Sequence, residues 1–304
     1  MKQTAEIVAA ARKAGLALPA FNIPYLPMLD TVVRAVRDED SFALIEVARV
    51  EWEKFESKSI EAVAEEFARS ADPQHVRLHL DHVPVIDEDQ QRVDYMPLIE
   101  RAIASGYQSV MVDGSRLALE DNIRATRQVA EGAHIAGIPC EAELGAVLGH
   151  EAGPLPPYEE LFRTGRGFTD PEEARRFVSE SGCDWLSVAI GNIHGAISEA
   201  QRGQKKVEAR LNLDHLARLS ELTGIPLVLH GGSGIQPEYV RRAFTAGISK
   251  INVGTEIRQA YEQALQAGGS LEAAQEALYR RTRELIRETY RLSGSRATLL
   301  GDAR

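Results

Sequence analysis

Eight short apolar segments alternate with amphipathic helical patterns along the chain, and this alternation restricts the fold more than any other feature. The predicted strands lie at 18–22, 42–48, 76–81, 108–113, 138–143, 185–190, 226–230 and 249–253. The predicted helices lie at 26–38, 59–70, 94–105, 119–136, 171–181, 212–223 and 236–246. These segments have the lengths and periods of buried strands and of helices with one apolar face. Eight strands alternating with helices predict an α/β protein with a single closed (β/α)₈ TIM barrel.

A doubly wound open sheet is the alternative fold. Such a sheet usually has fewer strands and a glycine-rich turn after the first one. Here the first predicted strand ends in Phe21-Asn22-Ile23-Pro24, without such a turn. Because no repeat, low-complexity tract or linker interrupts the pattern, we expect one domain over residues 1–304, with a C-terminal helical extension at 255–292.

Composition limits the compartment and the partners. The chain has a formal net charge of −10, which argues against general nucleic-acid binding. No apolar run approaches the roughly 20 residues of a membrane-spanning helix, and the first residues lack the apolar core of a signal peptide. Cys140 and Cys183 lie in apolar segments and do not indicate a disulfide framework. We therefore expect a cytoplasmic protein without nucleic-acid or membrane partners.

Polar residues gather where the predicted strands end. The segment Leu78-His79-Leu80-Asp81-His82 runs from an apolar strand directly into an acid and an imidazole. The full set of such residues is Asn22, Asp81, His82, Asp113, Glu143, Asn192 to His194, His230 and Asn252. Barrel enzymes place their chemistry at the carboxyl ends of the strands. The sequence therefore predicts one shared site built from seven strands.

Three of these residues form a candidate metal site. His82, His194 and His230 each end or closely follow a strand, and three imidazoles with an open fourth position are typical of catalytic zinc. The alternative is three separate histidines in satisfied, partly buried positions. Their common place on one barrel face favours the metal. We interpret His79 as a buried polar partner within its strand, and His75, His134 and His215 as structural or solvated.

Two glycine-bearing loops follow the last two strands, at 231–234 and 252–255. In barrels, the loops after strands 7 and 8 commonly bind phosphate, because backbone amides and a helix N-terminus meet there. Each loop could also be a simple tight turn. Together they indicate a phosphorylated ligand.

Six sequence blocks carry a family resemblance over nearly the whole chain. They are HLDH at 79–82, GYQSVMVDGSRLALEDNI at 106–123, EAELG at 141–145, VAIGNIHG at 188–195, LVLHGGSGI at 227–235 and SKINVGTEI at 249–257. In this order they resemble the class II, metal-dependent ketose-bisphosphate aldolases, which include the fructose- and tagatose-bisphosphate aldolases. The resemblance implies reversible aldol cleavage of a phosphorylated ketose to dihydroxyacetone phosphate and an aldehyde. It also implies a barrel that assembles as a homodimer or homotetramer.

The resemblance assigns roles to individual residues. His82, His194 and His230 match zinc ligands, although another divalent ion, with a monovalent cation beside it, also fits the family. Asp81 matches the acid/base at the cleaved carbon, and Glu151 matches an acid that acts on the substrate α-proton. Asp113 and Glu143 match carboxylates near the metal that can hold a second ion. The residues matching the dihydroxyacetone phosphate pocket are Asn22, Gly195, Gly231, Ser233, Asn252 and Thr255.

Several positions depart from the family pattern. Ala48 stands where a serine is common, Gly254 where fructose-type members carry aspartate, and Arg49 and Glu51 follow the second strand. The 146–158 loop has a histidine in place of paired acids. The differences at Ala48 and Gly254 predict poor turnover of fructose 1,6-bisphosphate relative to another ketose phosphate.

Three functions therefore stay open: an aldolase, another metal-dependent barrel enzyme, and a sugar-phosphate-binding protein that no longer catalyses. Asp81 argues against the last, because binding alone does not need that acid. Within the aldolase reading, a Schiff base on Lys250 is the rival mechanism.

Overall fold

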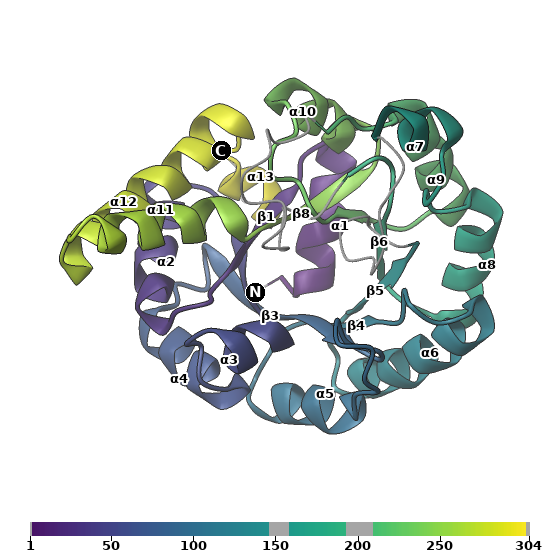
Figure 1. The fold of residues 1–304 in the computed structure, drawn as a ribbon, viewed down its shortest axis with the longest axis horizontal. Helices are drawn as coiled ribbons and strands as arrows, with labels where there is room; N and C mark the ends of the chain where they lie inside the picture. The colour runs from purple at the N-terminus through teal and green to yellow at the C-terminus, as the bar shows by residue number, and fades with distance from the viewer. Residues whose placement is uncertain (1, 146–157, 193–208, 302–304) are drawn as a thin grey trace.

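Eight parallel strands close into a barrel with helices around it (Figure 1). The computed structural model describes residues 2–145, 158–192 and 209–301. The strands follow one another around the barrel in chain order. They are β1 (Leu18–Asn22), β2 (Ala43–Ala48), β3 (Val76–Pro84), β4 (Val110–Asp113), β5 (Cys140–Leu144), β6 (Trp185–Val188), β7 (Leu227–Leu229) and β8 (Ile248–Val253). The predicted barrel is confirmed.

The predicted helices are present with small shifts at their ends. They are α2 (Leu29–Asp38), α4 (Ile60–Ser70), α5 (Tyr95–Ala104), α6 (Leu119–Ile135), α8 (Pro171–Ser181), α9 (Leu213–Thr223) and α10 (Pro237–Thr245). A short 3₁₀ turn, η1 (Leu26–Met28), precedes α2. The sequence patterns missed α1 (Thr4–Ala14), α3 (Arg49–Lys54), α7 (Tyr158–Thr164) and α13 (Arg296–Leu300).

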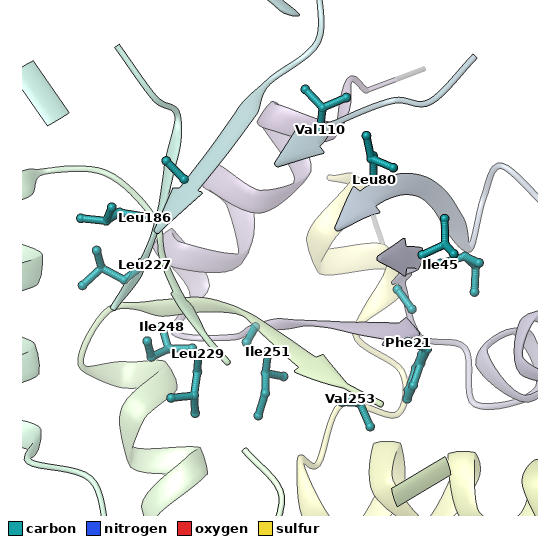
Figure 2. Packing of buried hydrophobic residues seen from close by; sticks show 14 of the residues in the cluster. Phe21, Ile45, Leu80, Val110, Leu186, Leu227, Leu229, Ile248, Ile251 and Val253 are labelled. Carbon is teal, nitrogen blue, oxygen red and sulfur yellow. The ribbon is translucent and has the colours of Figure 1, made fainter. Parts of the chain in front are cut away.

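The apolar core lies mainly between the strands and the surrounding helices. Figure 2 shows strand residues such as Phe21, Leu80 and Leu229 projecting outward from the ring of strands. Because side chains alternate across a strand, the neighbouring residues face the interior of the barrel. The interior is therefore a separate compartment from this outer core.

The amino end of the barrel interior is filled by apolar side chains. Ile7, Val8 and Ala11 of α1 pack there with buried residues of the strands. Those strand residues are Leu18, Ala20, Leu44, Trp185 and Val228. Helix α1 thus closes one end of the barrel and leaves the polar carboxyl ends of the strands as the open end.

Two long helices follow the last strand. They are α11 (Thr255–Gln266) and α12 (Leu271–Glu284), which runs on into one π-helical turn, η3 (Leu285–Thr289). In Figure 1 they form a hairpin that extends beyond the ring on the side of α2. This arrangement agrees with the helical extension predicted at 255–292. None of the helices that the structure describes combines the length and apolar content that crossing a bilayer needs.

Candidate active site

A cavity of about 1510 Å³ opens at the carboxyl ends of the strands. The predicted site residues that line it are Asn22, Asp81, His82, Asp113, Glu143, His230, Gly231, Ser233, Asn252 and Thr255. The structure therefore brings these residues together. Asn192 does not line the cavity but is buried beside it, with Nδ2 donating to the backbone carbonyl of His230 at 2.8 Å. His194, Gly195 and Glu151 lie outside the described residues.

Asp81 is held by two amides inside the barrel. Asn22 Nδ2 donates to Asp81 Oδ2 and Asn252 Nδ2 donates to Asp81 Oδ1, each at 3.0 Å. Burial alone would raise the pKa of Asp81, but the positive charges of His82, Lys250 and His230 lower it below its ordinary value. The side chain is thus an oriented carboxylate that can accept a proton from a group in the cavity.

His82 follows Asp81 at an irregularity in β3, where the register with β4 shifts between Leu80 and Val83. Its backbone has a positive φ of 20°, an uncommon conformation for a residue other than glycine. The imidazole Nδ1 lies 3.4 Å from Asp113 Oδ2. This local backbone directs the imidazole beside Asp81 and into the cavity.

His230, which directly follows β7, lies beside His82 in the cavity. Its ring centroid is 4.5 Å from that of His82. Nε2 is paired with Glu141 Oε1 at 2.9 Å, whereas Nδ1 lies 3.2 Å from Glu143 Oε2 without hydrogen-bond geometry. A carboxylate behind one ring nitrogen is the usual way in which a protein orients a metal-binding histidine.

The donor atoms fit a divalent cation. One ligand atom from each of Asp81, His82 and His230 lies within 4.8 Å of the others, and the same holds for His82, Asp113 and Glu143. Nδ1 of His230 is buried and has no hydrogen-bond partner in the described part of the chain. Buried polar atoms normally have a partner, so this nitrogen is suited to bind a cation held by these histidines and carboxylates.

The surrounding carboxylates favour positive charge at this point. Burial opposes protonation of His82, but Asp81, Asp113 and Glu143 together outweigh it, and the pKa of His82 rises to about 9. Burial likewise opposes protonation of His230, but its contacts with Glu141 and Glu143 raise its pKa to about 10. A divalent cation would replace these ring protons and use the same negative surroundings.

Beneath the site, Lys250 and two acids form a buried charged layer. Lys250 Nζ lies 3.0 Å from Glu141 Oε2 and 3.2 Å from Glu46 Oε2, and all three side chains are fully buried. The interior face of β3 also contributes His79, whose Nδ1 lies 2.8 Å from the Ser109 hydroxyl. The prediction that His79 is a buried polar partner is therefore confirmed.

The segment after β2 forms helix α3 at the cavity wall. Glu51 is buried there and accepts a hydrogen bond of 2.8 Å from the backbone N–H of Ala48. Burial raises the pKa of Glu51 to about 8. Arg49 lies 2.8 Å from Glu53 and 3.4 Å from Asp87. The positions that depart from the family pattern after β2 therefore lie on the wall of the cavity.

The glycine-bearing loops also line the cavity. Helix α11 begins at Thr255, directly after Gly254, and presents its N-terminus next to the cavity. A Cβ added at Gly254 would lie 3.1 Å from Asn22 Oδ1, which is tighter than an ordinary contact. A side chain at position 254 would therefore need the Asn22 amide to shift by a few tenths of an ångström.

Comparison with known proteins identifies the family. The model of the family described as class-II fructose-bisphosphate aldolase matches residues 2–296. The chain belongs to this family. Class II aldolases depend on divalent metal ions, and the clusters of histidine and carboxylate donors described above are consistent with this membership.

Individual relatives resemble this chain to different extents. A fructose-bisphosphate aldolase from Geobacillus stearothermophilus is 37% identical over 191 residues, which make up 63% of this chain and 58% of that protein. The YdjI aldolase from Escherichia coli K12 is 27% identical with a TM-score of 0.74, covering 97% of this chain and 98% of the other. The fructose-bisphosphate aldolase from Campylobacter jejuni, at 18% identity, shows the shared fold alone, with a TM-score of 0.73 over 95% and 94% of the two chains.

The buried charged layer was not predicted from the sequence. Two acids in the alternating run Glu141-Ala142-Glu143 nevertheless indicate that both face the barrel interior. Lys250 lies inside the barrel, where its Nζ donates to Asn252 Oδ1 at 2.6 Å. Glu46 carried no signal of its own within the apolar segment around it.

Proposed function

We propose that this protein is a divalent-metal-dependent aldolase that reversibly cleaves a phosphorylated ketose to dihydroxyacetone phosphate and an aldehyde. The observation that carries the proposal is the carboxylate of Asp81, held by the amides of Asn22 and Asn252 and adjacent to His82 and His230. Metal-assisted carbon–carbon cleavage needs an oriented proton acceptor next to histidines that can bind the metal.

In this proposal the histidines bind the metal and the acids transfer protons. His82, His194 and His230 would hold a zinc ion, with Asp113 and Glu143 able to hold a second one. A bound divalent ion would supply Lewis-acid stabilisation of the negative charge that cleavage leaves on the ketone half of the substrate. Asp81 would take the hydroxyl proton as the carbon–carbon bond breaks. Glu151 would act on the α-proton of dihydroxyacetone phosphate.

The glycine loops support binding of the phosphate half of the substrate. Gly231 and Ser233 follow β7, and Thr255 begins α11 on the same side of the cavity. Backbone N–H groups at a helix N-terminus attract anions. In this proposal they hold the phosphate, together with Gly195, while Asn22 and Asn252 face the carbon skeleton.

The geometry of Lys250 argues against the rival Schiff-base mechanism. A lysine must be a neutral amine to attack a ketone. Burial would lower the pKa of Lys250, but the negative charges of Glu141 and Glu46 raise it above its ordinary value. Its Nζ is also fully buried beside Asn252, Glu141 and Glu46, and Lys250 is not among the described residues that line the cavity.

A coupled assay for released dihydroxyacetone phosphate tests the function. The panel should contain the 1-phosphates and 1,6-bisphosphates of fructose and tagatose. We expect cleavage of at least one ketose, with fructose 1,6-bisphosphate among the poorer substrates because of Ala48 and Gly254. Protein that holds metal and cleaves no member of the panel in either direction would contradict the proposal. We also expect a homodimer or homotetramer, which light scattering would measure.

A further inference from the structure

Lys250 donates a short hydrogen bond to the amide that holds the carboxylate of Asp81. Its Nζ lies 2.6 Å from Asn252 Oδ1. The contacts to Glu141 and Glu46 are longer, and the Glu46 and Glu141 Oε2 atoms lack hydrogen-bond geometry with any described residue. Asn252 is thus the best-placed partner of this ammonium group.

The chemistry of the two groups determines how the amide is oriented. An ammonium group has only donors, so the Asn252 atom that faces it must be the carbonyl oxygen. The Nδ2 end then faces the other way and donates to Asp81 Oδ1 at 3.0 Å. Because the terminal torsion of asparagine is broad and nearly two-fold, the amide needs a fixed partner on its oxygen side to keep one orientation.

We propose that Lys250 is a positioning residue for the cleavage step, acting through Asn252 on the orientation of Asp81. This inference rests on the aldolase function proposed above. The chain Lys250–Asn252–Asp81 fixes one carboxylate oxygen, and Asn22 fixes the other. The carboxylate then meets the substrate hydroxyl at a defined angle, without contact between Lys250 and the substrate.

A purely structural role for Lys250 makes a different prediction. If it served only to neutralise Glu46 and Glu141, its loss would affect the whole site, including the histidine paired with Glu141. Removal of the α-proton of dihydroxyacetone phosphate does not use Asp81 in the proposed scheme. This partial reaction therefore separates the two roles.

The test compares cleavage with hydrogen exchange in the full-length, metal-loaded protein. We expect Lys250→Met to lower kcat for cleavage about 100-fold, since small misplacements of a reacting group have effects of this size. KM and the rate of solvent deuterium exchange into dihydroxyacetone phosphate should change by less than about threefold. Equal losses of cleavage and exchange, at unchanged metal content, would overturn the proposal.

A double-mutant cycle tests the route through the amide. Asn252→Ala removes the link, so adding Lys250→Met to it should lower kcat by less than about threefold further. Multiplicative effects of the two substitutions would show that Lys250 acts independently of Asn252, and would also overturn the proposal.

Three further variants serve as controls. Ser249→Ala removes a buried polar group next to Lys250 on the same strand and should leave both reactions unchanged. If Lys250→Met does not fold, Lys250→Met with Glu46→Gln removes one of the two acids left without a cation, and Glu46→Gln alone is its reference. Absence of cleavage in the wild-type protein would count against the aldolase function. Cleavage by the wild-type protein, together with a Lys250→Met variant that loses cleavage and hydrogen exchange equally, would count against this inference.

Discussion

Gly254 lies directly against Asn22, and a Cβ at position 254 would come within 3.1 Å of Asn22 Oδ1. Asn22 in turn donates the 3.0 Å hydrogen bond to Asp81 Oδ2. The absence of a side chain after β8 therefore permits a contact that orients the proposed acid/base on β3.

Substitution of this glycine should disturb the site without unfolding the barrel. We expect Gly254→Ala to displace the Asn22 amide and lower kcat/KM about tenfold, because a misplaced polar contact near the reacting atoms costs roughly 1–2 kcal/mol. Steady-state kinetics of the best substrate measure the effect, and urea denaturation measures stability.

Gly132 offers a matched control within α6, where nothing lies within 4 Å of an added Cβ. Gly132→Ala should keep full activity and raise the free energy of unfolding by about 0.5–1 kcal/mol, because alanine has the higher helix propensity. Unchanged activity in Gly254→Ala would show that Asn22 tolerates the added methyl group.

Asp81 should be required for cleavage but not for metal retention. We expect Asp81→Ala to lower kcat by about 10²–10⁴-fold, the usual contribution of a general acid or base, while metal content stays unchanged. Inductively coupled plasma mass spectrometry and the coupled assay give the two values. Asp89→Ala, at an exposed acid that pairs with Lys54, is the control and should lose less than about threefold in activity. A fully active Asp81→Ala variant would remove this acid from the mechanism.

Metal removal should separate the histidines from Asp81. Purified protein is expected to hold about one tightly bound divalent ion per chain, and chelation should abolish turnover. His82→Ala and His230→Ala should each lose the ion and the activity, because each removes one of the imidazoles proposed to hold the ion. Full activity after exhaustive chelation would contradict the proposed metal dependence of the reaction. Re-addition of zinc, manganese or cobalt to the chelated protein would identify the preferred ion.

The order of the strands was predictable because buried strands and amphipathic helices differ in length and period. The convergence of Asp81, His82 and His230 followed from that order, since the carboxyl ends of barrel strands meet. Helix α3 was missed because Arg49 to Lys54 is short and mixes charges with Trp52, so no helical period was evident.

The contacts among inward-facing charges could not be read from the sequence. Glu46, Glu141 and Lys250 lie on three strands that are far apart in the chain. Their ion pairs depend on which strand faces which across the barrel interior, and that requires the closed geometry. Alternation predicts that such residues point inward, but it does not predict their partners.

Glu39 links the end of α2 to the C-terminal helices and should make their stability depend on pH. Its side chain is 2% exposed and contacts Arg283, Arg287 and Ser293 at 2.6 Å each. Burial would raise the pKa of Glu39, but these partners lower it below its ordinary value. The ionised form therefore stabilises the fold fully above the unfolded pKa of about 4.3, and this contribution is lost as the pH falls through the folded pKa.

We expect Glu39→Gln to lower the free energy of unfolding by about 1–3 kcal/mol at pH 7, with a difference from wild type that shrinks as the pH falls below about 5. Urea denaturation of both proteins between pH 4 and 7 measures it, and Glu276→Gln, at an exposed pair with Arg280, should show a small effect at every pH. A Glu39→Gln difference that does not change with pH would show that packing, and not the charge of Glu39, holds these helices against α2.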